Sequence, residues 1–328
     1  MIEYAKWITT PVTKPGAPVI FRKTVRLPDV PKTATAEISA FGCYSLFLNG
    51  SRVGNRLLTP GWTVYACRIQ YQTYDLSGLL RAGENRIEIE VAPGWASGAI
   101  AFQPDQPTVT RLAAVFAFSL TFPDGSGCRF RSDTDWEVCS SHTLYSDIYH
   151  GETVDLTAPL RHLGKAVASD FHTALIPQIN EPVTEQERIA PLSVFTTSKG
   201  ETVIDFGQNL AGYVEVRIRA PRGARIVLHH AEVLDRDGNF YTDNLRGARN
   251  LCTYICDGGE NRFRPSYSYQ GFRYVRLTEF PFSDPDPAGF RAVVIHSELQ
   301  RTGQFVCGSE PINRLYENMI SSLCSNFI

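Results

Sequence analysis

Apolar and polar residues alternate with a period of two in several segments of this chain, which limits the folds open to it. Between residues 84 and 91, Ile87, Ile89 and Val91 stand on one side of the alternation and charged residues on the other. Residues 213–219 repeat the pattern, with valine or isoleucine at 214, 216 and 218. A period of two with one charged side predicts antiparallel strands that bury one face and solvate the other.

Turn-forming pairs separate these segments. Asn49-Gly50 is the strongest turn signal, because both residues tolerate the positive φ of a type I′ hairpin turn. Further turn signals occur at Pro60-Gly61, Ala82-Gly83, Pro123-Asp124-Gly125, Asp237-Gly238 and Asp257-Gly258-Gly259. Short strands joined by tight turns predict β-sandwiches.

Composition supports a β-rich fold. The chain holds 25 Gly, 20 Pro and only 2 Met, so it is rich in turn residues and poor in a side chain that fills helical cores. A linker is expected at residues 171–191, where prolines and charges interrupt the periodicity. We therefore predict an all-β fold of two antiparallel, jelly-roll-like sandwiches at 1–170 and 171–300, followed by one C-terminal helix within 301–328.

The predicted helix begins after Ser309, which is placed as N-cap, with Glu310 and Pro311 in the first turn. Its apolar residues follow helical spacing and form one stripe: Ile312, Leu315, Tyr316, Met319, Ile320 and Leu323. No glycine cap or polar segment closes the helix before Ile328. We expect the stripe to pack against helices outside this chain, which looks cut off.

Charge and hydropathy exclude several classes of function. Thirty-two basic and 34 acidic residues give a net charge of −2, so we expect neither a nucleic acid nor an anionic membrane as partner. No apolar run reaches the ~18 residues of a membrane span, and Met1–Thr10 lacks the apolar region of a signal peptide. These features predict a cytoplasmic protein.

Metal and cofactor sites are not expected. The 8 Cys are scattered and predicted to be reduced thiols, and Cys252 and Cys256 lie four apart rather than at zinc-knuckle spacing. Residues 235–239 imitate half of a calcium loop, but position 12 is Arg246 instead of glutamate, which favours a β-turn. The adjacent residues His229-His230 point to opposite faces of a strand and cannot share a metal as neighbours.

Four acidic residues lie in apolar surroundings and are candidates for glycosidase carboxylates: Glu152, Asp155, Asp205 and Glu232. The sequence offers no means of pairing them, and acids in such positions are more often strand-end caps or arginine partners, which is the favoured interpretation of each. No catalytic residue is assigned.

Sugar binding needs an exposed aromatic face with polar groups around it. Trp62, Tyr65 and Trp95 lie beside Pro-Gly or Gly turns where such a platform could form, and they are the candidate substrate-binding residues. The stretch Ala96–Gln106 beside them holds few polar residues. The alternative is that these side chains plug the end of a sandwich core.

Several strings, taken in order, resemble the N-terminal domain of bacterial α-L-rhamnosidases. They are SLFLNGSRVG (45–54), LTPGWTVY (58–65), YQTYD (71–75), GEN (83–85), SDTDW (132–136) and IYHGETVD (148–155). Later strings resemble the concanavalin-like sandwich of the same enzymes and the entry into their helical barrel. These are DFGQNLAG (205–212), HAEVL (230–234), NLR (244–246), YQGFRYV (269–275), FVCGS (305–309) and INRLYEN (312–318).

This resemblance implies an enzyme that hydrolyses terminal α-L-rhamnose from glycosides by an inverting mechanism, with its catalytic carboxylates in an (α/α)6 barrel. The family's acidic motif would follow the point matching Phe327, so the chain alone is expected to be inactive. Its implied partners are rhamnose-containing glycosides and the catalytic domain, which it would brace. A stand-alone carbohydrate-binding module and a structural adaptor are the alternatives.

Overall fold

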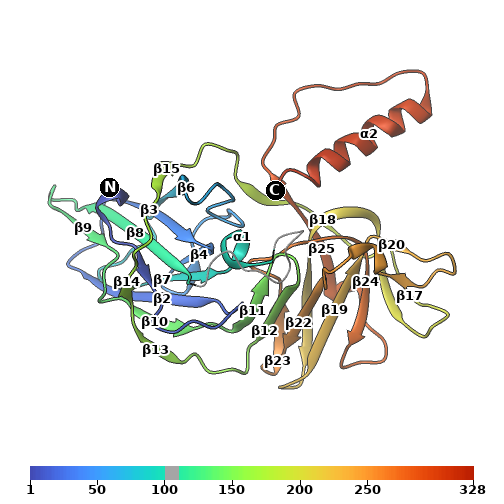
Figure 1. The fold of residues 1–328 in the computed structure, drawn as a ribbon, viewed down its shortest axis with the longest axis horizontal. Coiled ribbons are helices and arrows are strands. Elements are labelled where there is room, and N and C mark those ends of the chain that lie inside the picture. The colour runs from blue at the N-terminus through green and yellow to red at the C-terminus, as the bar shows by residue number, and fades with distance from the viewer. Residues whose placement is uncertain (100–110) are drawn as a thin grey trace. The chain divides into compact units, whose positions relative to one another are not determined.

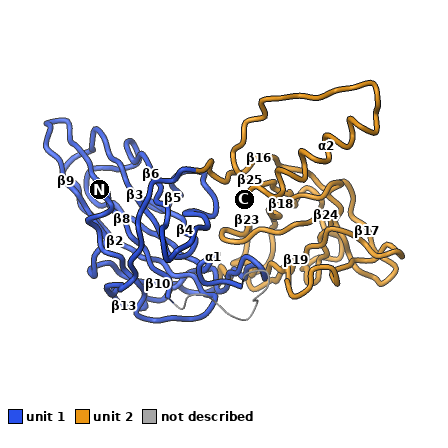
Figure 2. The backbone as a smooth tube through the Cα atoms, turned by 45° about the horizontal axis from the view of Figure 1, so that its top comes forward, with its two compact units in different colours: residues 1–154, 158–179 blue, residues 155–157, 180–328 orange. Residues whose placement is uncertain are grey.

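The structure is a computed structural model that describes residues 1–99 and 111–328. The chain forms two compact units, coloured separately in Figure 2: unit 1 comprises residues 1–154 and 158–179, and unit 2 comprises 155–157 and 180–328. Figure 1 labels many of the elements of both units. The division into residues 1–170, 171–300 and 301–328 stays a prediction about domains.

Unit 1 is built from two sheets. The first has the order β14-β1-β8-β3-β6-β15, with β9 paired to β8. Its strands are β1 (Ile8–Thr9), β3 (Thr33–Phe41), β6 (Arg68–Asp75), β8 (Ala113–Thr121), β9 (Gly127–Arg131), β14 (Val167–Ala168) and β15 (Ala174–Pro177). β15 pairs with β6 in parallel, which departs from the expected antiparallel arrangement.

The second sheet of unit 1 has the order β13-β10-β2-β7-β4-β5. Its strands are β2 (Val19–Leu27), β4 (Cys43–Leu48), β5 (Ser51–Arg52), β7 (Gly83–Ala92), β10 (Glu137–Ser140) and β13 (His162–Lys165). Unit 1 also holds a hairpin of β11 (Thr143–Asp147) with β12 (Gly151–Asp155), the 3-10 turn η1 (Ile2–Tyr4) and the short helix α1 (Gly94–Ser97).

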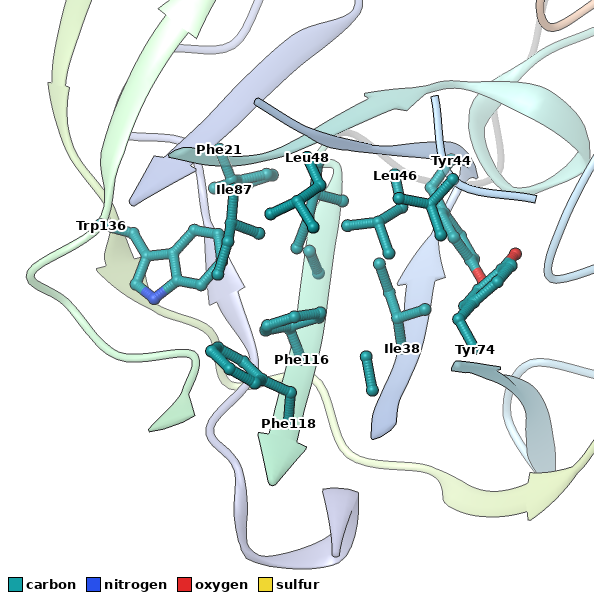
Figure 3. Close-up of a cluster of buried hydrophobic side chains, with 14 of the residues drawn as sticks. Phe21, Ile38, Tyr44, Leu46, Leu48, Tyr74, Ile87, Phe116, Phe118 and Trp136 are labelled. Atoms are coloured by element: carbon teal, nitrogen blue, oxygen red, sulfur yellow. The ribbon is translucent and has the colours of Figure 1, made fainter. Parts of the chain in front are cut away.

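The core of unit 1 lies between these sheets (Figure 3). Phe116, which is fully buried, packs its ring against the edge of Trp136 at a centroid distance of 5.7 Å. Ile87 and Ile89 of β7 are buried as their alternation predicts. The Asn49-Gly50 turn joins β4 to β5 with φ values of 53° and 84°, which confirms the predicted hairpin.

Unit 2 is organised around the long strand β18 (Thr202–Ala220), whose two parts pair with different strands. The first part of β18 pairs with β17 and β24, and the last part pairs with β25 and β23. The order of the main strands is β22-β19-β24-β18-β25-β16. The two-sandwich, all-β fold with a C-terminal helix is therefore confirmed.

The other elements of unit 2 follow in chain order. They are β16 (Val183–Ile189), β17 (Ser193–Thr196), β19 (Arg225–Ala231), β20 (Val233–Leu234), β21 (Phe240–Tyr241), η2 (Asp243–Leu245), β22 (Leu251–Ile255), β23 (Gly259–Phe263), β24 (Gln270–Glu279), η3 (Pro287–Gly289), β25 (Phe290–Ser297) and α2 (Glu310–Cys324). No helix in the described ranges is long and apolar enough to cross a membrane.

The helix α2 begins where the sequence predicts, with Ser309 at the N-cap position. The Ser309 side chain makes no capping hydrogen bond, however. Instead the Asn313 side chain donates to the carbonyl of Cys307 at 2.8 Å and accepts from its N–H at 2.9 Å. This pair of bonds fixes the chain as it enters the helix.

Candidate functional site

A polar groove of about 620 Å³ lies within unit 2, between the sheet and α2. It brings together segments that are far apart in sequence. The sheet contributes Gly207, Gln208, Asn209, Leu210, Ala211, Glu232, Gly271 and Arg273, and α2 with its C-terminal end contributes Arg314, Glu317, Asn318, Ser321, Ser322, Ser325 and Asn326. The groove falls in the range of ~300–1,000 Å³ that is usual for small-molecule pockets.

An irregularity in β18 forms one wall of the groove. The register of β18 against β24 shifts between Asp205 and Leu210, so the intervening residues bulge from the ladder. Gly207 has a φ of +82°, a conformation that side chains disfavour. Its N–H donates to Asp205 Oδ1 at 2.7 Å, which closes the bulge.

Arg273 of β24 holds the same carboxylate. Its Nε donates to Asp205 Oδ1 at 2.8 Å and its Nη2 donates to Oδ2 at 2.9 Å. Burial raises the pKa of Asp205, but the hydrogen bonds from Arg273 and from the Gly207 N–H outweigh burial and leave that pKa below its usual value. Asp205 is therefore a fixed anion that positions the bulge and the arginine.

Glu232 is the half-buried carboxylate of the groove. Asn209, at the end of the bulge, donates from Nδ2 to Glu232 Oε1 at 3.1 Å. Gly271 of β24 leaves space beside this carboxylate, because a Cβ there would lie 3.4 Å from Oε1. The glycine thus keeps one side of Glu232 open to the groove.

The helix α2 presents a polar side to the groove, and its apolar stripe does not line the groove. Ser321, Ser322 and Asn318 line the groove. The stripe is exposed instead: Ile312 by 49%, Leu315 by 58%, Met319 by 60% and Leu323 by 49%. No side chain of α2 is buried within the part of the chain that the structure describes.

The predicted aromatic platform lies in unit 1, and its three members have different surroundings. Trp62 is 60% exposed on the loop between β5 and β6. Tyr65, on the same loop, is half-buried and packs edge-on against Phe41 at a centroid distance of 5.3 Å. Trp95 is half-buried in α1. Their role in sugar binding stays a prediction.

Tyr65 and Trp95 both neighbour the buried thiol of Cys43. Burial, followed by the influence of Cys43, raises the pKa of Tyr65 well above its usual value. Burial also raises the pKa of Cys43 to about 12, against a backbone hydrogen bond from Trp95 that lowers it. Gly94 is required here, because a Cβ would lie 2.3 Å from the Cys43 sulfur. Residues 100–106 of the stretch that follows Trp95 lie outside the described residues.

The four candidate carboxylates lie in different parts of the structure. Glu152 is buried in unit 1 and accepts from Ser146 Oγ at 3.5 Å, while Asp155 accepts from the N–H and hydroxyl of Thr157. Glu232 instead lines the groove of unit 2, and Asp205 holds the lining residues Gly207 and Arg273 without lining the groove itself. The sequence did contain a signal for the groove, because the strings DFGQNLAG, HAEVL and YQGFRYV each contribute residues that line it.

Other features singled out from sequence are structural. Residues 235–239 form a turn in which Asp235 Oδ1 accepts from the N–H groups of Asp237 and Asn239. His230 is buried and His229 lies 2.9 Å from an Arg276 nitrogen. All eight cysteines are free thiols, and four of them are buried. No cluster of metal-ligating side chains occurs among the described residues.

Unit 1 contains two smaller hollows beside the segment Thr10–Val19, of about 260 and 380 Å³. Both are lined largely by apolar or aliphatic groups, and Val12, Lys14 and Ala17 border both of them. Neither is lined by Trp62, Tyr65 or Trp95. Of these three hollows, the groove of unit 2 has the most polar lining side chains.

Two family descriptions match the chain in succession. The α-L-rhamnosidase N-terminal domain matches residues 29–188, and the bacterial α-L-rhamnosidase concanavalin-like domain matches residues 195–296. A curated α-L-rhamnosidase of Streptomyces avermitilis is 33% identical over 303 residues, which is 88% of this chain and 29% of that protein. The chain thus spans about a third of the length of the curated relatives it matches.

Solved structures show the same similarity. Native α-L-rhamnosidase from Aspergillus terreus has a TM-score of 0.92 and 31% identity, covering 100% of this chain and 40% of that one. The Streptomyces avermitilis α-L-rhamnosidase complexed with L-rhamnose has a TM-score of 0.90 and 33% identity, covering 97% of this chain and 32% of that one.

Proposed function

We propose a function from one premise: the chain belongs to the bacterial α-L-rhamnosidase family. In this proposal the two sandwiches are non-catalytic parts of an enzyme that removes terminal α-L-rhamnose from glycosides. The pair of family matches, to residues 29–188 and 195–296, carries the proposal. The bound L-rhamnose named for the Streptomyces avermitilis relative supports rhamnose-containing glycosides as the substrate class.

The proposed reaction inverts the configuration of the sugar. A protonated carboxylic acid assists departure of the aglycone oxygen, and a carboxylate ~6.5–9.5 Å away activates water on the opposite face of the ring. Such an acid needs a raised pKa. Eight carboxyl groups have a pKa below the usual value, because hydrogen-bond donors outweigh burial, and none of these eight fits the role of that acid: Glu3, Asp75, Asp124, Glu185, Glu201, Asp205, Glu215 and Asp235. We propose that the 328-residue chain has no hydrolytic activity by itself.

The proposed role of the chain is to brace the catalytic domain. The exposed stripe of α2, from Ile312 to Leu323, offers an apolar surface on which such a domain could pack. Burial of a leucine-sized side chain contributes about 1.5–3 kcal/mol, so several such contacts would hold the domain firmly.

An aryl α-L-rhamnoside tests the proposal directly. The purified 328-residue chain is incubated with 4-nitrophenyl α-L-rhamnopyranoside, and the Streptomyces avermitilis relative serves as the positive control. We expect the relative to release nitrophenol from this substrate and the 328-residue chain to release none. Turnover that rises in proportion to the concentration of the 328-residue chain would contradict the inactive role.

A second candidate is a stand-alone carbohydrate-binding module. It is favoured by the 60% exposure of Trp62, since an exposed indole can stack on the apolar face of a sugar ring. Calorimetry with L-rhamnose, with and without Ca²⁺, distinguishes the two. Saturable binding that Trp62→Ala abolishes supports a sugar-binding role for unit 1, and an absence of binding leaves the bracing role.

A further inference from the structure

Three chemical properties of the groove in unit 2 define the ligand that it fits. The first is an excess of neutral hydrogen-bonding groups over charged ones. Amide side chains line it at Gln208, Asn209, Asn318 and Asn326, and hydroxyl side chains line it at Ser321, Ser322 and Ser325. These groups both donate and accept, as a ligand rich in hydroxyl groups requires.

The second property is a balance of charge. The charged lining residues are two arginines and two glutamates. Arg273 is paired with Asp205, and Glu317 is paired with Arg301 at 3.0 Å. Glu232 and Arg314 then remain as one anion and one cation without an ion-pair partner among the described residues. A balanced site of this kind favours a neutral ligand over a phosphate or a metal ion.

The third property is the availability of side chains for a ligand. Within the described part of the chain, Gln208, Arg314 and Asn318 make no side-chain hydrogen bond to protein, although all three line the groove. Glu232 accepts one hydrogen bond, from Asn209, and a carboxylate can accept several. Both walls of the groove therefore carry donors and acceptors that can bind a ligand.

The sheet wall of the groove is also rigid. Asp205 fixes the β18 bulge through Gly207 and fixes Arg273 through two hydrogen bonds. The bulge ends at Asn209, which in turn holds Glu232. A site whose polar groups are held in place before binding loses less entropy when a ligand arrives.

We propose that this groove is a saccharide-binding site for the sugar portion of a rhamnoside, with Glu232 as the principal hydroxyl acceptor and the polar side of α2 as the opposite wall. The inference rests on the proposed function for the identity of the sugar. It adds a second recognition site in the concanavalin-like sandwich, separate from the aromatic residues of unit 1. Among the described residues, no aromatic side chain lines the groove, so recognition there depends on hydrogen bonds rather than on ring stacking.

Binding is measured by calorimetry, or by saturation-transfer NMR if it is weak, with the 328-residue chain and a disaccharide of L-rhamnose on glucose. Glu232→Gln removes the charge and retains an acceptor for Asn209. A hydrogen bond to a charged group is worth more than a neutral one, so this variant should bind roughly tenfold more weakly. Ser322→Tyr, at an exposed position of α2, should obstruct the groove from the other wall without entering the core.

Two controls locate the effect. Glu260→Gln makes the same charge change at an exposed site of β23 outside the groove, and Trp62→Ala removes the exposed indole of unit 1. We expect Glu260→Gln to bind the disaccharide like the wild type. Trp62→Ala tests the aromatic residues of unit 1 and should leave the binding that Glu232→Gln and Ser322→Tyr weaken. Far-UV circular dichroism of every variant establishes that the fold is retained.

Two results would overturn the groove as a site. In the first, Trp62→Ala abolishes binding while Glu232→Gln and Ser322→Tyr bind normally, which places the sugar on unit 1. In the second, no saturable binding of the disaccharide occurs. Neither result would contradict the proposed bracing of a catalytic domain by this chain, because the aryl rhamnoside assay tests that proposal separately.

Discussion

Arg273 binds Asp205 through two parallel hydrogen bonds, from Nε at 2.8 Å and from Nη2 at 2.9 Å, across neighbouring strands of unit 2. The Asp205 side chain is 11% exposed, so water can replace little of what the guanidinium supplies. This pair holds the β18 bulge in place, and the candidate groove depends on it.

Replacement of Arg273 by lysine should therefore destabilise unit 2. Lysine keeps the charge but loses the planar pair of donors, and we expect a cost of about 1–2 kcal/mol in the free energy of unfolding. Urea unfolding followed by far-UV circular dichroism measures it. Arg225→Lys is the matched control, because Arg225 and its partner Glu279 are each 49% exposed and should cost less than about 1 kcal/mol. Equal losses in the two variants would contradict the role of the bulge.

Glu215 should make unit 2 sensitive to acid. It is buried under three arginines that donate to it: Arg262 at 2.5 Å, Arg217 at 3.0 Å and Arg188 at 3.1 Å. Burial raises the pKa of Glu215, but these donors outweigh burial and lower the pKa to about 2 from an ordinary 4.5. The pKa is lower in the folded state than in the unfolded state, so Glu215 stabilises the fold above pH 4.5 and loses this effect as the pH falls toward 2. Its contribution to the free energy of unfolding above pH 4.5 is on the order of 3 kcal/mol.

The variant Glu215→Gln tests this pH dependence. It should be less stable than the wild type at pH 7 and should lose less stability between pH 4.5 and 2. Urea unfolding at a series of pH values gives both curves, with Glu279→Gln as an exposed control. Parallel curves for wild type and Glu215→Gln would show that the arginines do not act through this carboxylate.

His230 should also make the fold less stable as the pH decreases, in a pH interval above the one in which Glu215 acts. Its ring is fully buried, Nδ1 lies 2.9 Å from the carbonyl oxygen of Asn250, and Nε2 has no partner among the described residues. Burial lowers the pKa of His230 to about 4, against a smaller raising effect of the Asn250 backbone, from an ordinary 6.5. The unfolded chain binds the proton first, so stability should fall as the pH decreases from 6.5 to 4.

His230→Phe should flatten the stability curve in that interval while changing stability at pH 7 by less than about 1.5 kcal/mol, since an aromatic ring of similar volume still packs on Phe272. Unfolding free energies at pH 7, 5.5 and 4 test this. If the variant loses as much stability as the wild type between pH 6.5 and 4, a group other than His230 takes up the proton.

The core of unit 1 and its predicted aromatic platform should respond differently to truncation. Phe116→Ala removes a fully buried ring and should cost about 3–5 kcal/mol. Trp62→Ala removes a ring that is 60% exposed and should change stability by less than about 0.5 kcal/mol. All four tryptophans lie in unit 1, so tryptophan fluorescence reports the unfolding of this unit alone. A large loss from Trp62→Ala would mean that Trp62 supports the core and is no platform.

Local features of the fold could be predicted because each depends on neighbouring residues. The alternation at residues 84–91 became part of β7, and the pair Asn49-Gly50 became a hairpin turn with two positive φ values. The helical spacing after Ser309 became α2. In each case backbone conformation and the side to be buried follow from a few consecutive side chains.

Other features could not be predicted from the same pattern. The alternation places Glu215 on the solvated face of its strand, but arginines from β16 and β23 cover it and leave the side chain 1% exposed. The parallel pairing of β15 with β6 has no local signal either. Both depend on which strands become neighbours.

The amino-acid sequence was enough to predict the strands, the turns, the C-terminal helix and the resemblance to α-L-rhamnosidases. The folded chain was needed to show that Glu232 and the Asp205-bound Arg273 line one groove while Trp62 lies in another unit. Periodicity indicates which face of a strand is buried, whereas the order of strands in a sheet arises from pairing between distant segments, as between β18 and β24.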